Sequence, residues 1–123
     1  MKRDSAKECR RIVFRIGKLD DPSYIFKIQK NASQLALNGF VIKPNEYHRQ
    51  PVMIAIEGGI KAVKFYKNLM MNRIKWSENE NSCKIIWEGG VENPTLGKWK
   101  EYSVSDESQT LNILNEKKME QFW

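Results

Sequence analysis

The segment spanning residues 52–76 constrains the fold of this chain more than any other part of its sequence. It begins with the apolar run VMIAI, which predicts a central strand of a sheet. Glu57 and two glycines follow, and the remainder predicts a helix in which apolar residues recur every three or four positions. One helical face then holds Val63, Tyr66, Met70 and Ile74, with Ala62, Phe65 and Leu69 widening it.

The opposite side of this predicted helix carries cations and amides, namely Lys61, Lys64, Asn68, Asn72 and Lys75. The 123-residue chain is basic as a whole, with a formal charge of +6. Such an excess favours an anionic partner such as nucleic acid, because neutralised phosphates release their counterions. Solubility is the competing explanation of the same charge, and composition does not separate the two.

Residues 10–16 predict a strand with one buried face and one basic face, because apolar and basic side chains alternate along it. We expect Ile12, Phe14 and Ile16 to face the core. The intervening positions hold Arg11, Val13 and Arg15. The arginine at position 15 should therefore project from an open face of the sheet.

The next segment predicts a single helix over residues 22–38. Asp21 before Pro22 is a favourable start, and Asn38 followed by Gly39 is a typical stop. An alternative remains open at the start of this helix. Alternation in the sequence YIFKI is typical of a strand, and Asn31 with a glutamine three residues later resembles a capping box for a shorter helix.

Short apolar segments at residues 40–42 and 83–87 predict two more strands. The order strand, helix, strand, strand, helix, strand fits a ferredoxin-like α+β fold, a split βαβ with an antiparallel sheet. Both helices would lie on one sheet face, and the other face would stay open unless the C-terminal segment covers it. The helices should pack through Ile25, Ile28, Leu35, Val63, Tyr66, Met70 and Ile74.

The C-terminal segment predicts an extension of this fold. Residues 99–104 predict a strand or arm, and Ser105 and Asp106 can cap a helix that carries Leu111 and Leu114. An apolar end follows at Met119, Phe122 and Trp123. We expect a flexible segment over residues 1–8, a ferredoxin-like domain over residues 9–104, and a helical extension packed on it over residues 105–123.

The sequence does not assemble a catalytic or metal site. Cys9 and Cys83 suggest reduced strand thiols of an intracellular protein, and His48 lies in a polar loop that suggests a surface position. Glu57 and Glu88 each precede two glycines, and they could form a carboxylate pair or, more commonly, accept hydrogen bonds from backbone amides. The glycine turn could hold a phosphate but lacks the P-loop pattern. We therefore expect no enzyme, no metal and no cofactor.

Basic residues interleaved with aromatic ones predict a binding surface for RNA. Cations serve phosphates, amides read base edges, and flat rings stack on unpaired bases. The candidate residues are Arg15, Lys27, Lys30, Asn31, Gln34, Arg73, Lys75, Trp76, Lys98, Trp99 and Lys100. Each tryptophan is individually more often a packing residue, and each lysine a solvated one, so their grouping carries the prediction.

Several short motifs of this chain resemble a known family. They are FKI at residues 26–28, NASQL at 31–35, EGG at 57–59, RIKW at 73–76 and WEG at 87–89. Together they resemble the C-terminal domain of pre-mRNA-processing factor three, a component of the U4/U6 small nuclear ribonucleoprotein. The resemblance runs from about residue 11 to residue 123. The chain departs from the family in its short SENENS loop, where a long charged insert is common, and in Ile60, where the family often has proline.

The resemblance implies a ferredoxin-like, non-catalytic domain that binds U4/U6 small nuclear RNA. The expected contact lies where a base-paired stem meets the single-stranded 3′ part of U6, in support of tri-snRNP assembly and pre-mRNA splicing in the nucleus. Other U4/U6 and tri-snRNP proteins are the implied partners of a monomeric domain, and no membrane is expected. The alternative is a protein-interaction domain without RNA binding, as in the RWD-associated relatives, which would use the apolar end at residues 119–123.

Overall fold

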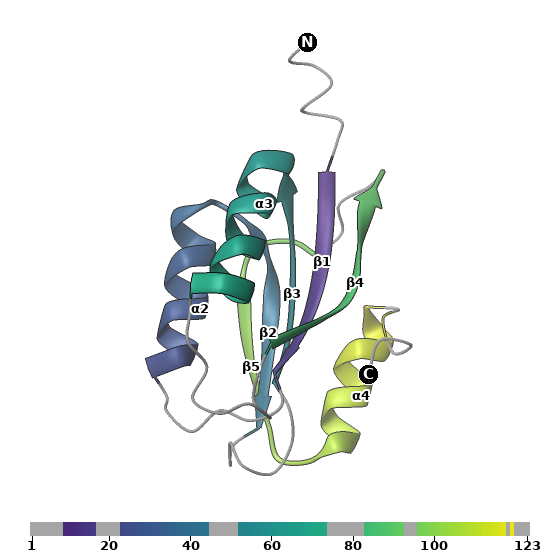
Figure 1. Cartoon of the computed structure of the whole chain (residues 1–123). Coiled ribbons are helices and arrows are strands. Elements are labelled where there is room, and N and C mark those ends of the chain that lie inside the picture. The colour runs from purple at the N-terminus through teal and green to yellow at the C-terminus, as the bar shows by residue number, and fades with distance from the viewer. Residues whose placement is uncertain are drawn as a thin grey trace.

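The structure is a computed structural model that describes residues 9–16, 23–44, 52–73, 83–92, 96–117 and 119 (Figure 1). Its strands are β1 (Cys9–Ile16), β2 (Asn38–Pro44), β3 (Val52–Gly59), β4 (Cys83–Val91) and β5 (Lys100–Val104). Its helices are α2 (Ser23–Gln34), α3 (Ile60–Asn68) and α4 (Glu107–Glu116), and a π-helical turn, η1 (Leu69–Arg73), continues α3. Among these residues no helix has the length and hydrophobicity needed to traverse a bilayer.

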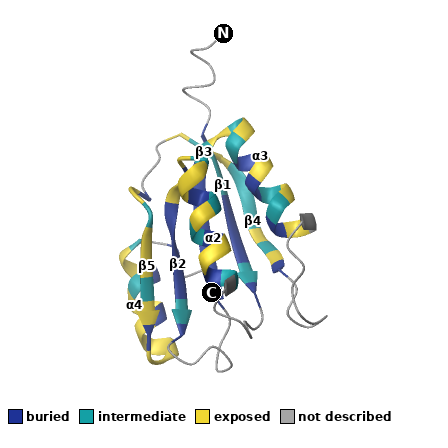
Figure 2. Ribbon diagram, turned by 90° about the vertical axis from the view of Figure 1, so that its left-hand side faces the viewer, coloured by how far each residue is buried: buried dark blue, intermediate teal, exposed yellow. Residues whose placement is uncertain are grey.

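The strands form one sheet in the order β4-β1-β3-β2-β5. The first four of these strands pair antiparallel, and β5 adds to the edge of β2 in a parallel direction. Helices α2 and α3 lie side by side on one face of the sheet, and α4 lies on the other (Figures 1 and 2). The predicted ferredoxin-like α+β plan is thereby confirmed, with β5 as its extension.

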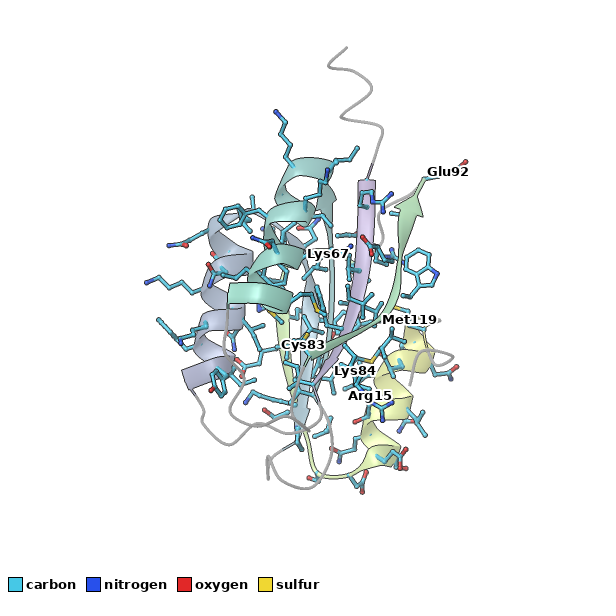
Figure 3. The ribbon with its side chains drawn as sticks, in the orientation of Figure 1. Arg15, Lys67, Cys83, Lys84, Glu92 and Met119 are labelled. Carbon is cyan, nitrogen blue, oxygen red and sulfur yellow. The ribbon has the colours of Figure 1, made fainter. Side chains whose placement is uncertain are left out.

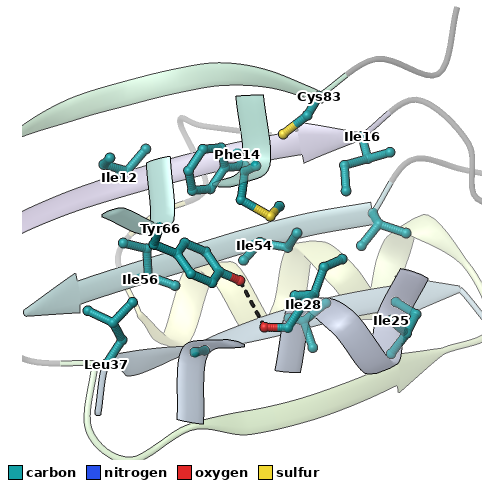
Figure 4. Close-up of a cluster of buried hydrophobic side chains, with 14 of the residues drawn as sticks. Ile12, Phe14, Ile16, Ile25, Ile28, Leu37, Ile54, Ile56, Tyr66 and Cys83 are labelled. Atoms are coloured by element: carbon teal, nitrogen blue, oxygen red, sulfur yellow. Dashed lines mark hydrogen bonds between the residues drawn. The ribbon is translucent and has the colours of Figure 1, made fainter. Parts of the chain in front are cut away.

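The main core lies between the sheet and the pair α2 and α3. Ile12, Phe14 and Ile16 of β1 face it, as alternation predicted, and meet Ile25, Ile28, Val63, Tyr66 and Met70 from the helices (Figure 4). Tyr66 is fully buried, and its hydroxyl donates a hydrogen bond of 3.0 Å to the Ile28 carbonyl oxygen (Figure 4). This bond satisfies a buried polar group and ties α3 to α2.

A second core fills part of the opposite face of the sheet, where an open basic face was expected for β1. Val13 is fully buried there, together with Phe40, Met53, Leu114 and Met119. Helix α4 supplies the cover, so the basic positions on β1 flank an apolar contact. The extension thus contributes a core of its own, and burial of its apolar residues stabilises the whole sheet.

Helix α2 ends four residues earlier than predicted. Ala36 adopts φ 56°, and its N–H donates to the Ser33 carbonyl at 3.0 Å, while Leu37 N–H donates to the Ala32 carbonyl at 2.9 Å. These two bonds form a Schellman motif, which terminates a helix. Gly39 instead belongs to β2, where an added Cβ would lie 2.0 Å from the Ala55 carbonyl oxygen. The glycine predicted to stop the helix therefore permits close approach of two strands.

The second helix begins at Ile60, directly after the two glycines, as predicted, and its hydrogen bonding changes within the predicted span. Both glycines after Glu57 belong to β3, Gly59 caps α3, and the α-helical hydrogen bonding gives way to η1 after Asn68. Val63, Tyr66 and Met70 are buried as expected, whereas Phe65 is 48% exposed, so its predicted place in the apolar face was wrong. Ile74, another predicted core residue, lies outside the described residues.

The C-terminal elements follow the prediction with one exception. Asp106 accepts a hydrogen bond of 3.0 Å from the Gln109 backbone N–H and caps α4, as the sequence indicated. Leu114 is buried, but Leu111 is exposed, and Thr110 takes the second buried position of the helix.

Candidate nucleic-acid interface

A surface groove lies between the solvent face of α2 and Trp99, with a volume of about 490 Å³. Helix α2 contributes residues at spacings of three and four, which places them on one face opposite the buried Ile25 and Ile28. The lining residues are Phe26, Gln29, Lys30, Ser33, Gln34 and Trp99. The groove thus combines two aromatic rings, one cation, two amides and a hydroxyl.

Phe26 forms one aromatic side of this groove and is 63% exposed. The Lys30 ammonium lies 5.5 Å from the centroid of its ring. A cation at this distance is attracted to the ring and helps to hold its orientation. An exposed ring with a cation beside it offers a stacking surface and a phosphate contact within one turn of a helix.

Trp99 forms the other aromatic side, and the segment around it is held in place by three contacts. The Leu96 N–H donates to the Glu57 carboxylate at 2.9 Å, and the Gly39 N–H donates to the Gly97 carbonyl at 3.2 Å. Directly after Trp99, Lys100 pairs with Phe40 in the parallel ladder. Because the backbone is fixed on both sides of it, Trp99 is brought against α2 and packs on the main core.

The indole nitrogen of Trp99 is a buried donor without a hydrogen-bond partner in the described part of the chain. A buried donor in that condition costs free energy, of the order of 1–3 kcal/mol.

The structure brings three of the predicted residues together, because Lys30, Gln34 and Trp99 share the groove. Lys98 and Lys100 are exposed on either side of Trp99. Lys27 is exposed on α2 and lies 5.7 Å from the Tyr24 ring.

Two other predicted residues, Asn31 and Arg15, do not line the groove. The Asn31 amide donates to the Lys27 carbonyl at 2.8 Å. Arg15 is half-buried on the side of the sheet that α4 covers, away from α2 (Figure 3). Lys75 and Trp76 lie outside the described residues. Arg73 ends η1, but its side chain is not among those described.

Sequence reasoning missed three lining residues, Phe26, Gln29 and Ser33. The signal that would have found them is positional, because residues 26, 29, 30, 33 and 34 follow the spacing of one helical face. The exposed position of a phenylalanine within that pattern is the informative observation.

The two carboxylates that could have formed a catalytic pair face opposite sides of the sheet. Glu57 pairs with Arg11 and Glu88 pairs with Ile12, and neighbouring residues of a strand point to opposite faces. Among the described residues no group of three or more histidine, cysteine or acidic side chains could hold a metal.

Burial raises the pKa of the Cys83 thiol to about 12, and burial together with the nearby Glu57 carboxylate raises the pKa of the Cys9 thiol. Both free thiols therefore stay protonated at neutral pH.

The fold defines the chain as a ferredoxin-like α+β domain, with a groove on its helical face. Residues 12–123 match the family described as the small nuclear ribonucleoprotein Prp3, C-terminal domain. Because this match covers nearly the whole chain, the chain belongs to that family. The family resemblance noted in the sequence is confirmed.

Two curated relatives have longer chains. Protein RDM16 of Arabidopsis thaliana is 27% identical over 126 residues, which cover 90% of this chain and 16% of the relative. The U4/U5/U6 small nuclear ribonucleoprotein prp3 of Schizosaccharomyces pombe is 28% identical over 144 residues, which cover 98% of this chain and 26% of the relative. The chain therefore spans about a quarter of these relatives or less.

Solved structures share the fold at low sequence identity. The BLUF protein BlrB has a TM-score of 0.59 and 16% identity, with 94% of this chain and 84% of the other covered. An acylphosphatase from Coxiella burnetii has a TM-score of 0.54 and 14% identity, with coverage of 79% and 96%. These likenesses concern the architecture alone.

Proposed function

We propose that this domain is a non-catalytic RNA-binding module of a spliceosomal protein, and that the groove between α2 and Trp99 receives single-stranded RNA. The carrying observation is that two aromatic rings, Lys30 and the Gln34 amide converge in one groove. Rings of this kind stack on bases of any sequence, cations contact phosphates, and amides discriminate base edges. Membership in the Prp3 C-terminal family supports the spliceosomal setting.

The proposed ligand is U4/U6 small nuclear RNA at the junction of a stem with the single-stranded 3′ part of U6. The groove suits the unpaired strand, since only unstacked bases can lie between side chains. Exposed lysines beside it, Lys27, Lys98 and Lys100, suit the phosphates of the adjoining stem. The proposal includes a nuclear location and partners among the proteins of the U4/U6 and tri-snRNP particles, as the name of the S. pombe relative suggests.

The alternative is a protein-interaction domain that docks through its apolar C-terminal end. One observation weighs against it: Met119, the first residue of that end, is 2% exposed and packs in the domain's own second core. A side chain used inside the domain is not free to anchor a partner.

The experiment is a binding titration of this domain with a labelled stem that bears a 3′ overhang, at two salt concentrations. Phe26→Ala should weaken binding roughly 5- to 150-fold, since stacking contributes about 1–3 kcal/mol per base. The matched control is Phe65→Ala, because Phe65 is also an exposed aromatic residue on the helical layer but does not line the groove. Phe65→Ala should bind as the parent does.

Three further variants separate charge from base recognition. Lys30→Ala should lower the salt slope by about one unit for every RNA, whereas Lys61→Ala, at an exposed lysine outside the groove, should leave the slope of the parent unchanged. Gln34→Ala should instead reduce the preference for the natural overhang over a scrambled one. Absence of binding at low salt would favour the protein-interaction alternative, and equal losses in Phe26→Ala and Phe65→Ala would place the RNA elsewhere.

A further inference from the structure

A second hollow, of about 470 Å³, lies between α3, η1 and the paired strands β1 and β4. It does not share a lining residue with the groove beside Trp99. Its charged members are Arg10 of β1, Lys64 and Lys67 of α3, and Glu88 of β4, and its apolar members include Ile60 and Met71. This hollow is therefore a separate candidate for a ligand.

The charges in the hollow form a network around one carboxylate. The Lys67 ammonium lies 3.0 Å from each Glu88 oxygen, and one Arg10 guanidinium nitrogen lies 3.6 Å from the nearer of them (Lys67 in Figure 3). Lys64 is an exposed third cation. Three cations thus face one carboxylate among the described lining residues, and the excess positive charge favours an anionic ligand.

The apolar members decide which anion fits best. Met71 of η1 is 39% exposed, and Ile60, at the start of α3, is half-buried. Methionine adapts to apolar side chains of different shapes, which is why it is frequent at peptide-binding surfaces. A bare phosphate would leave this apolar surface unfilled, whereas an anion with an apolar side chain would cover it. Among the described residues, no aromatic ring lines the hollow on which a base could stack.

We propose that this hollow binds a short acidic peptide segment of a protein partner. An apolar side chain of the peptide would contact Met71, while its carboxylates contact Lys64 and displace Glu88 in part from Lys67 and Arg10. The assignment rests on charge complementarity. Glu88 competes with the peptide carboxylates for Lys67 and Arg10 and so limits the affinity. The partner is thus recognised by one apolar anchor flanked by acidic residues.

The test is a titration of the isotope-labelled domain with a peptide of five glutamates around one leucine, followed by amide chemical shifts. Shifts should concentrate on α3 and on the Glu88 region of β4. Glu88→Gln should tighten binding about two- to fivefold, because it removes the competing carboxylate from an exposed ion pair. A structural defect would not produce tighter binding, so this variant separates the site from damage to the fold.

Lys64→Glu should weaken the same binding by about fivefold or more, since it replaces an attraction by a repulsion. Lys61→Glu, an equal charge change at an exposed position of α3 outside the hollow, is the matched control. Equal losses in the two variants, unchanged affinity in Glu88→Gln, or shifts confined to other surfaces would overturn the proposal. It would also be overturned if duplex RNA, but not the peptide, shifted the amides that line the hollow. Phe26→Ala should leave peptide binding unchanged, so failure of the RNA proposal would be recognised separately.

Discussion

The tripeptide Glu-Gly-Gly occurs twice in this chain, at Glu57 and at Glu88, and the two copies have opposite roles. The Glu57 side chain is 1% exposed, accepts from Arg11 at 2.7 and 3.1 Å, and accepts from the Leu96 N–H at 2.9 Å. The Glu88 side chain is 27% exposed and bonds Lys67 at the surface. One carboxylate is buried and holds two segments of the chain together, and the other lines a hollow at the protein surface.

The difference comes from strand register and not from the local sequence. Arg11 of β1 lies opposite Glu57 on one side and opposite Gly89 on the other, so the two tripeptides are offset by one residue. In a strand an offset of one residue turns a side chain to the other face of the sheet. Two identical motifs can therefore serve different functions when their register differs.

The largest expected effect comes from Glu57→Ala. Removal of one partner from a largely buried ion pair is strongly destabilising, by about 3–5 kcal/mol of unfolding free energy. The variant removes the Glu57 acceptor from Arg11 and from the Leu96 N–H. Urea denaturation of this variant and of Glu88→Ala measures the contrast, and similar midpoints for the two would break the comparison.

A second effect concerns the glycine that follows each glutamate. A Cβ on Gly58 would lie 2.6 Å from the Leu37 Cδ2 atom, and Leu37 is buried in the main core. Gly58→Ala should therefore cost about 1–3 kcal/mol, as overpacking of a core does.

The counterpart, Gly89→Ala, should cost less in thermal denaturation. Its Cβ would lie 2.9 Å from the Trp87 ring, which is half-buried and can move toward solvent. A greater loss for Gly89→Ala than for Gly58→Ala would show that Trp87 is held more tightly than its exposure suggests.

The smallest effect belongs to Glu88→Gln. The pair with Lys67 is partly exposed, with 40% and 27% of the two side chains accessible. Exposed pairs contribute about 0.2–1 kcal/mol, and salt screens them, so the loss should shrink in high salt. Denaturation at low and high ionic strength measures this effect. A loss of unfolding free energy that does not change with salt would show that the Glu88 pair is less accessible to solvent than these exposed fractions indicate.

Periodicity predicted the main core because both of its components are regular. Helical spacing relates Val63, Tyr66 and Met70, and strand alternation relates Ile12, Phe14 and Ile16. Each pattern defines a single apolar face, so the sequence predicts which side of each element is buried. Phe65 was misplaced, since it stands at the margin of the helical face, where spacing alone does not fix burial.

Other features depend on tertiary contacts that local sequence does not encode. Ala36 ends α2 in a left-handed conformation, which an alanine in the sequence does not predict. Gly39 does not terminate the helix but allows two strands to pack closely. Lys30, Gln34 and Trp99 were each singled out from the sequence. Their meeting in one groove depends on the Glu57 contact that directs the chain from β4 to β5.

The position of β1 in the sheet has a consequence for the order in which the chain can fold. β1 is the first strand in the sequence, yet its neighbours are β3 and β4, and β4 follows α3 and η1. Until β4 has been synthesised, one edge of an apolar strand has no partner, and such edges pair readily with other chains. Contacts between residues this distant in sequence also slow folding, because the chain must lose the entropy of closing a long loop before the contacts stabilise it. Ribosome-bound chains that end before β4 should therefore depend on chaperones more than the finished domain does.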